Sequence, residues 1–391
     1  MTLPQELPRL EDMPSLPDTT PYSPHVVQHP DRLTDGLPHG TQFAIANIET
    51  NFGEPGTLQV VVAVGHRAVQ TVQSDERFTT SDGQGLRRDP EIKSGSVVLY
   101  NEGDAHSRLR KPLSNAMTPK ALERIAPRTR TRLEAMVDEV GTEPFDAARY
   151  LGRIVAEATG DLLGVGPDQG YDAAVAERLS HMATATQGAT DAYDGRTGQT
   201  FGAFGPVFGA VLGGQAAEGS VGHSLRQAFI EGELTEFEAG NLIATVPIAG
   251  IRTQKGGLEF LLRSLAEGNH LGELMANPAK DQNATLEALR RGSPLRLIVR
   301  GGPAEFEGLR TVACQHSANH DRTVWSNPYK FDIRRSNLQR HTALGTGVHR
   351  CVGAQAARLT QVTLIEVMRD KGITDVALNG DPIVDTTDPA I

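Results

Sequence analysis

The most chemically suggestive stretch of the chain surrounds the second of its two cysteines. It reads Leu344-Gly345-Thr346-Gly347-Val348-His349-Arg350-Cys351-Val352-Gly353 and leads into a segment of helical character. A cysteine at the start of a helix has its thiolate favoured by the helix dipole and by free backbone N–H groups. Glycines on both sides allow a tight backbone and the close approach of a flat ligand. The segment therefore indicates a thiolate beside a flat ligand, with a buried structural cysteine as the alternative.

Two pairs of charged residues stand at spacings that place them on one face of a helix. Glu287 and Arg290 are three residues apart, and His106 and Arg110 are four apart. Residues at these spacings are neighbours on a helix surface, so each pair can act together. Charged residues on helices are usually solvated, so neither pair is diagnostic by itself.

Length and composition limit what these residues belong to. The chain has 391 residues, of which 38% are hydrophobic and 22% charged, which is ordinary for a protein with a sizeable core. A net charge of -10 disfavours general binding to nucleic acids or anionic membranes. Two cysteines, Cys314 and Cys351, exclude a disulfide framework and favour a reducing compartment.

Periodicity predicts a mainly α fold with a small β region. Apolar residues at helical spacing predict helices within 106–185, 234–267, 281–291 and 352–370. Short strands are expected near 41–70 and 297–315, and a long irregular loop over 316–350. The glycine-rich stretch 186–222 is costly to hold as a regular helix, so we expect it to be mobile.

The domain organisation predicted from these patterns is simple. Residues 1–35 read as an extended, proline-punctuated arm, and residues 36–391 as one domain. The first residues lack a basic segment followed by an apolar run, and no long apolar stretch follows. A cytoplasmic protein without membrane segments is therefore expected.

The cysteine segment resembles the haem-ligand loop of the cytochrome P-450 family, whose pattern is Phe-x-x-Gly-x-x-x-Cys-x-Gly. Gly347, His349, Cys351 and Gly353 match it, while Leu344 replaces the aromatic residue. The resemblance implies the family's fold, a triangular helical domain with a long central helix over haem b. It makes Cys351 the axial thiolate, which pushes electron density onto iron. Leu344 is expected to alter packing around the sulfur.

Other segments match the family in order. The resemblance implies that four basic residues bind the haem propionates: His106, Arg110, Arg300 and His349. It places the Glu287–Arg290 pair in an internal network whose third member is Lys330, where the family has arginine. Ser74-Asp75-Glu76-Arg77-Phe78 and Ala318-Asn319-His320-Asp321 are similar to further family landmarks.

The central helix departs from the family pattern. Where the family has an acid before a threonine, this chain reads Ala249-Gly250-Ile251-Arg252-Thr253. An arginine stays protonated and offers only donors, so it cannot relay protons as a carboxylate does. Oxygen chemistry with protons from water or substrate, direct use of peroxide, and an atypical coupling or rearrangement all stay open. Arg252 either binds an anionic group of the substrate or turns away to pair with an acid.

The resemblance implies a monooxygenase of specialised metabolism that oxidises a small organic molecule. Substrate contacts are expected from 82–100, 186–215, Ile248–Thr253 and Leu297–Val299. Electrons would come from an acidic ferredoxin and its reductase, with docking on a basic face that includes Lys111, Arg350 and Arg358. The alternatives are a peroxide-using or atypical haem enzyme, and a haem sensor or carrier without turnover.

Overall fold

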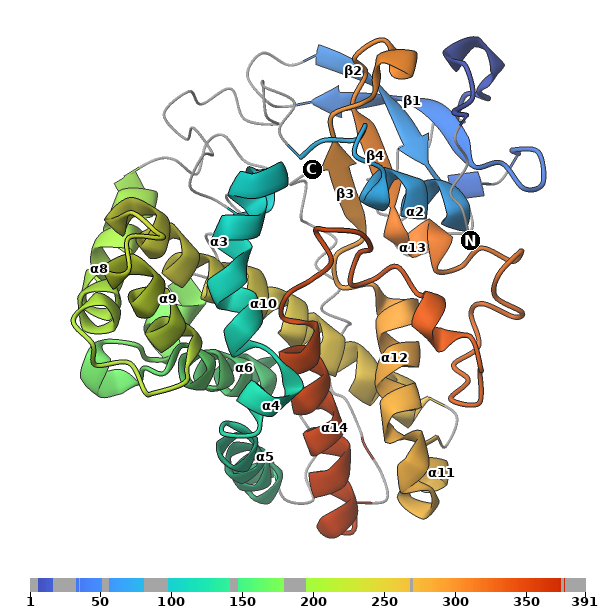
Figure 1. Ribbon diagram of the computed structural model, residues 1–391. Coiled ribbons are helices and arrows are strands. Elements are labelled where there is room, and N and C mark those ends of the chain that lie inside the picture. The colour runs from blue at the N-terminus through green and yellow to red at the C-terminus, as the bar shows by residue number, and fades with distance from the viewer. Residues whose placement is uncertain are drawn as a thin grey trace.

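The computed structural model describes most of the chain as a helical body with a small sheet at one side (Figure 1). The described residues are 6–16, 33–34, 36–50, 56–80, 98–140, 147–178, 195–267, 270–373 and 376.

The sheet has four strands in the order β1-β2-β4-β3. Its strands are β1 (Phe43–Thr50), β2 (Gly56–Ala63), β3 (Leu297–Arg300) and β4 (Thr311–Cys314). β1 pairs antiparallel with β2, β2 pairs parallel with β4, and β3 pairs antiparallel with β4. The sheet thus joins two segments that lie far apart in sequence, and Arg300 ends one of its edge strands.

The helices carry most of the core. They are α2 (His66–Ser74), α3 (Gly103–Ala116), α4 (Pro119–Leu122), α5 (Ala126–Val140), α6 (Ala147–Leu163), α8 (Gly195–Leu212), α9 (Val221–Ile230), α10 (Glu236–Ala266), α11 (His270–Ala276), α12 (Asp281–Gly292), α13 (Gln315–Ala318) and α14 (Ala354–Asp370). Short 3-10 turns lie at Leu10–Asp12, Val98–Tyr100, Pro167–Gln169, Pro278–Lys280, Ala304–Phe306 and Leu338–Arg340. One large apolar cluster unites α3, α5, α6, α8, α9, α10, α12 and α14.

Helix α10 is the longest element and runs through the helical body behind α3 (Figure 1). Its start is fixed by a capping box. Thr235 Oγ1 accepts from the Glu238 N–H, and the Glu238 carboxylate accepts from the Thr235 N–H at 2.9 Å. Pro247 lies inside the helix. α10 packs on α6, α12 and α14, so it contacts helices from both earlier and later parts of the chain.

Most predicted elements are confirmed. The mainly α fold with a small β region is the observed one, and the helices predicted over 234–267, 281–291 and 352–370 correspond to α10, α12 and α14. The prediction for 186–222 is wrong over much of its length, because α8 and α9 occupy part of it. Helix α8 buries Phe204, Val207 and Val211 in the core, and this apolar face outweighs the cost of its glycines.

The described part of the N-terminal arm attaches to the sheet. The Leu16 N–H donates to Ile45 O at 2.8 Å, and the Ile45 N–H donates to Pro14 O at 2.9 Å. Among the described residues, no helix combines the length and apolarity that crossing a membrane requires.

Candidate functional site

The loop that carries Cys351 is folded tightly against α2. Its ends are joined by the Cys351 N–H, which donates to Leu344 O at 2.8 Å. Gly347 has a φ of 69°, and a Cβ there would lie 2.7 Å from Gln73 O, so only glycine fits. Thr346 Oγ1 lies 2.8 Å from Ser74 Oγ, which fastens the loop to the end of α2. The glycine pattern in the sequence thus serves a close backbone contact.

Cys351 is exposed and lies two residues before Gly353, the N-cap of helix α14. Its pKa lies above the ordinary value because surrounding protein excludes water, and the Gly353 N–H and the charges of Arg110 and Arg350 offset only part of this effect. A metal ion deprotonates a coordinating thiol outright, so this shift does not oppose ligation. Cys314 is buried in β4, where burial raises its pKa to about 11, and it has no comparable access.

The residues predicted to bind propionates come from three segments and gather beside the loop. His106 and Arg110 lie on α3, Arg300 ends β3, and His349 lies in the loop. The ring centroids of His106 and His349 are 4.2 Å apart. Arg300 and Arg110 both lie close enough to lower the pKa of His349 electrostatically, after the larger effect of burial. The structure therefore brings all four residues into one group.

Two of these residues have unused hydrogen-bonding capacity. His106 is buried, and its Nε2 has no hydrogen-bond partner among the described residues. Burial, with the nearby His349 and Arg110, lowers the pKa of His106 to about 4, so the ring is neutral near pH 7. Arg300 retains some exposed area, but enclosure by protein lowers its pKa to about 10. Among the described residues, its side chain donates one hydrogen bond, to the carbonyl of its neighbour Val299 at 3.0 Å.

Glu102, which the sequence did not point to, completes the group. Its Oε2 lies 3.0 Å from His349 Nε2. Its Oε1 accepts from the backbone N–H of Thr80 at 2.6 Å and from the Thr80 hydroxyl at 2.7 Å. Burial raises the pKa of Glu102, but these hydrogen bonds outweigh it and hold the pKa below its ordinary value. An acid just before a helix usually serves the helix N-terminus, so the sequence gave no signal for this contact.

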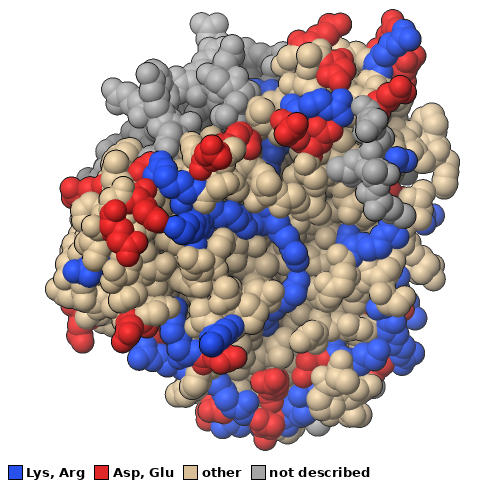
Figure 2. All heavy atoms as spheres, viewed as in Figure 1, with Lys and Arg blue, Asp and Glu red and all other residues tan. Residues whose placement is uncertain are grey.

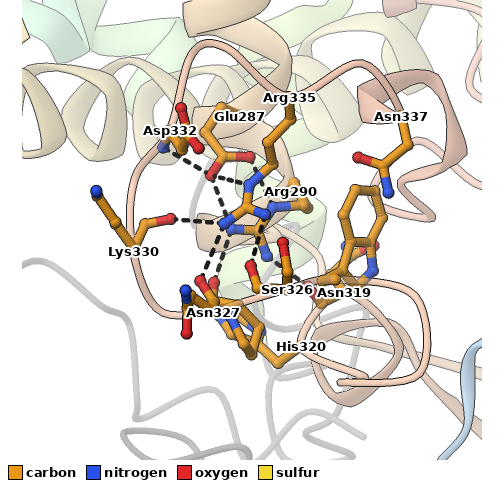
Figure 3. Close-up of polar contacts among 12 residues, drawn as sticks. Glu287, Arg290, Asn319, His320, Ser326, Asn327, Lys330, Asp332, Arg335 and Asn337 are labelled. Carbon is orange, nitrogen blue, oxygen red and sulfur yellow. Dashed lines mark hydrogen bonds and ion pairs between the residues drawn. The ribbon is translucent and has the colours of Figure 1, made fainter.

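A buried ion network is centred on Glu287 and Arg290 of α12 (Figure 3). Arg290 donates from Nε and Nη2 to the two oxygens of Glu287, at 2.7 and 2.9 Å. It also donates to the carbonyls of Asn319 and Pro328 at 2.6 and 2.7 Å. Neither Glu287 nor Arg290 has any exposed side-chain area. The pair that could have been a solvated surface pair is thus fully internal.

The third member of this network is Arg335, and the prediction of Lys330 is wrong. Arg335 Nε donates to Glu287 at 3.1 Å, and its remaining N–H groups bind the carbonyls of Ser326, Asn327 and Lys330. The Lys330 ammonium points away from Glu287 in Figure 3. The Asp332 N–H also donates to Glu287, so the chain folds back over the carboxylate and brings Arg335 there instead. The planar fork that lysine would have lost is retained.

The segment Ala249–Thr253, where the sequence departs from the family pattern, lies in the middle of α10. The Thr253 hydroxyl donates to Ala249 O at 2.8 Å. Gly250 lies on the side of α10 toward α6, since a Cβ there would approach Thr159 Oγ1 at 3.9 Å. Ala249 is exposed although it sits at the centre of the longest helix, and Arg252 is half-buried. The predicted contact segments 82–97 and 186–194 lie outside the described residues.

Comparisons with known proteins agree with this arrangement. No family model matches the chain. The cytochrome P-450 named CYP199A2 of Rhodopseudomonas palustris is 27% identical over 332 residues, covering 77% of this chain and 76% of that protein. Linalool 8-monooxygenase of Pseudomonas putida is 26% identical, covering 75% of each chain.

Solved structures of bacterial P-450 proteins share the fold. CalO2 aligns with a TM-score of 0.73 at 21% identity over 90% of each chain. CYP109Q5 of Chondromyces apiculatus aligns with a TM-score of 0.71 at 22% identity over 89% of each chain.

The fold and the cysteine loop together are those expected of a protein that holds a haem through a thiolate. The comparisons support a bacterial member of the cytochrome P-450 family, and the steroid and linalool monooxygenases among the relatives support a P-450 monooxygenase. The described residues fit a haem. Cys351 is exposed beside the start of α14, Ala249 is exposed at the centre of α10, and the buried Nε2 of His106 has no hydrogen-bond partner among the described residues.

Proposed function

We propose that this protein holds haem b through Cys351 and uses it to oxidise a small organic molecule of specialised metabolism. Gly353, Leu344 and Ala249 would line the porphyrin, and His106, Arg110 and Arg300 would face its propionates. A bound haem supplies the oxygen-activating redox chemistry, and a thiolate ligand favours O–O cleavage. The exposed thiol of Cys351, on a loop that only glycine can shape, is the observation that carries the proposal.

Reconstitution with haem, followed by reduction and addition of carbon monoxide, tests this proposal. The wild type is expected to give the spectrum of a thiolate-ligated haem, and Cys351→Ala is expected to lose it. Cys314→Ala is the matched control, because it removes the other thiol and should keep the spectrum. The same spectrum from Cys351→Ala and the wild type would exclude Cys351 as the ligand.

Arg252 would set the kind of substrate. A guanidinium always carries its charge and can bind a carboxylate with two parallel hydrogen bonds. Arg252, which is half-buried on α10 next to Thr253, would thus bind an anionic group of the substrate. Small carboxylic acids and their methyl esters can be compared by substrate-induced spectral titration. The acids should bind more tightly to the wild type, and Arg252→Ala should remove that preference; an unchanged preference would sink the idea.

Arg252 also favours a second candidate function. Because it cannot pass protons to bound oxygen as an acid does, protons would come from water or from the substrate near Thr253. The Thr253 hydroxyl gives its own proton to Ala249 O, which leaves its oxygen free to accept one. Direct use of hydrogen peroxide, or an atypical coupling or rearrangement, avoids the missing relay. Turnover with peroxide compared with turnover with a reductase system separates these, and absence of turnover with both indicates a sensor or carrier.

An acidic ferredoxin would deliver electrons at the basic face around the cysteine loop. In Figure 2 lysine and arginine side chains form an arc over α3 and the start of α14. Lys111 is paired with Glu233 at 2.7 Å, so Arg350 and Arg358 would contribute more of the attraction. Charge reversal at Arg350 or Arg358 should slow reduction by ferredoxin at low salt. Arg9→Glu on the N-terminal arm is the control, and equal slowing by that variant would refute the docking face.

A further inference from the structure

A small surface pocket adjoins the buried network of Glu287 and Arg290. It has a volume of about 310 Å³, and all the residues that line it fall between Arg322 and Lys330. None of these residues belongs to the cysteine loop, to α3 or to α10, so the pocket shares no wall with the proposed haem site. Pockets that bind small organic molecules begin at about this volume.

The buried network holds the backbone of the pocket in place. Arg335 donates to the carbonyls of Ser326 and Asn327 at 2.7 and 2.9 Å (Figure 3). Arg290 donates to the carbonyl of Pro328 at 2.7 Å. Three of the residues that line the pocket are thus fixed from behind by guanidinium groups. A ligand that enters a pre-formed pocket has little ordering cost to overcome.

Two exposed cations border the pocket without counter-charges. Among the described residues, the side chains of Arg322 and Lys330 form no hydrogen bond or ion pair. Asp321, the acid next to Arg322, accepts instead from the His66 N–H at 2.9 Å. The Lys330 ammonium points away from Glu287 in Figure 3, and none of the residues that line the pocket is acidic. The pocket is therefore positively charged and suits an anionic group.

An aromatic ring forms another part of the pocket. Tyr329 lines it and is 37% exposed. Its ring stacks on that of His320, with centroids 4.9 Å apart and planes inclined by 23°. His320 is held in turn, since its Nδ1 lies 2.8 Å from His316 O. A fixed aromatic ring with exposed area favours contact with a second flat ring.

We propose that this pocket is a second ligand-binding site, which takes a small planar organic anion such as an aromatic carboxylate. Arg322 and Lys330 bind the anionic group, and Tyr329 packs against the ring. The site differs from the one proposed for a substrate anion at Arg252, and the inference does not depend on the proposed haem chemistry. A ligand bound there also stabilises the folded chain, because it binds only the folded pocket.

The tryptophan of the pocket gives a direct measure of its occupancy. Trp325 is the single tryptophan of the chain, and it lines the pocket. The full-length protein as purified is titrated with benzoate, with cyclohexanecarboxylate, which lacks the flat ring, and with benzamide, which lacks the charge. Benzoate should change the fluorescence saturably and bind roughly threefold to fivefold more tightly than either of the others. Equal binding of all three, or no saturable binding by fluorescence and calorimetry, would overturn the proposal.

Substitutions of the cations locate the binding site. Arg322→Gln and Lys330→Gln should each weaken benzoate binding by roughly threefold to fivefold, and the double variant by about tenfold or more. Lys120→Gln is the matched control, because it removes an equal charge from an exposed position on α4 and should change nothing. Arg252→Ala should also leave the fluorescence titration unchanged. If Arg252→Ala removes benzoate binding and the pocket variants do not, the anion binds in the substrate site and the second site is excluded.

Tyr329→Leu tests the preference for a flat ring. Leucine keeps an apolar side chain but cannot stack, so benzoate and cyclohexanecarboxylate should bind this variant equally. Thermal unfolding shows whether the variant is folded, and Tyr329→Phe, which keeps the ring, should retain the preference. If Tyr329→Leu still prefers benzoate as the wild type does, or if inorganic phosphate binds the wild type as tightly as benzoate, the pocket selects charge alone and the planar ligand is refuted.

Discussion

Arg290 and Arg300 stand ten residues apart in sequence, and the fold treats them in opposite ways. Arg290 has no exposed side-chain area, and its guanidinium binds Glu287 and the carbonyls of Asn319 and Pro328. Among the described residues, Arg300 donates one hydrogen bond, to the carbonyl of its own neighbour Val299, and enclosure by protein lowers its pKa to about 10. The N–H donors of Arg290 are hydrogen-bonded within the protein, whereas those of Arg300 keep capacity to bind an anionic ligand.

The difference separates a structural cation from a ligand-binding one. A buried charge is tolerated when hydrogen bonds and a counter-charge replace its water, as Glu287 and the carbonyls do for Arg290. Within the described part of the chain, Arg300 has no such replacement apart from its bond to Val299 O and the negative charge of Glu102. The internal network around Arg290 therefore differs from the proposed propionate-binding group around Arg300 more in how many guanidinium N–H groups are hydrogen-bonded than in burial.

Removing the central carboxylate of the network should have the largest effect on stability. Glu287→Gln keeps the shape but leaves Arg290 and Arg335 without their counter-charge, at a cost of about 3–5 kcal/mol. Urea denaturation of the apoprotein measures the loss. Glu273→Gln is the control, since Glu273 pairs with the exposed Arg334 and should cost less than about 1 kcal/mol. Equal losses from the two variants would show that the network is no more structural than a surface pair.

The stability of the region around the network should fall in acid. Burial lowers the pKa of His320 to about 3 and that of His341 to about 3, with positive arginines adding to the effect. The unfolded chain therefore binds protons that the folded chain does not, once the pH falls below about 6.5. Stability is complete above that pH and is lost as the pH falls toward 3, at up to ~1.4 kcal/mol per unit for each histidine.

His320→Asn tests the acid effect. Asparagine can keep the donor that His320 Nδ1 presents to His316 O at 2.8 Å but does not titrate, so the loss of stability between pH 7 and pH 5 should become smaller. Urea denaturation at both pH values gives the slope. His39→Asn, at an exposed position, is the control and should leave the slope unchanged. A wild-type stability that does not change over this interval would contradict the prediction.

The sequence was informative where chemistry depends on local spacing. The glycines around Cys351 all belong to one loop, and the i,i+4 pair His106 and Arg110 belongs to one helix. Their relative positions could therefore be predicted from sequence spacing. The long helix α10 was also predictable, because its apolar pattern and its capping residues are local.

The predictions failed where contacts depend on how distant segments fold back. Arg335 reaches Glu287 only because the chain turns over the carboxylate at Asp332, and no spacing rule favours Arg335 over Lys330. Glu102 binds His349 across 247 residues, a contact that exists only in the folded molecule. The glycines of α8 suggested mobility, since burial of its apolar face is a tertiary effect that propensity does not include.

Arg300→Gln should reverse the outcome expected at Glu287. Loss of a cation without adequate partners should leave the melting temperature of the apoprotein unchanged or higher, because an uncompensated charge is removed. Haem affinity should fall about tenfold through loss of a charge-assisted hydrogen bond. Arg334→Gln, at an exposed arginine, should change neither quantity by much. A destabilised apoprotein with unchanged haem affinity would place Arg300 among the structural cations and would dissolve the comparison with Arg290.

An exposed pair gives the smallest effect and marks the lower end of the comparison. Lys371 binds Asp138 at 2.7 Å between α5 and the end of α14, with side chains 36% and 60% exposed. Water competes for both charges, so Lys371→Gln should cost about 0–1 kcal/mol in urea denaturation. Addition of 1 M salt should erase even that difference, because screening at this concentration acts over about 3 Å. If Lys371→Gln lowered the free energy of unfolding as much as Glu287→Gln does, a short ion pair would stabilise this fold even without burial. Burial with fully hydrogen-bonded donors would then no longer explain why Arg290 is structural.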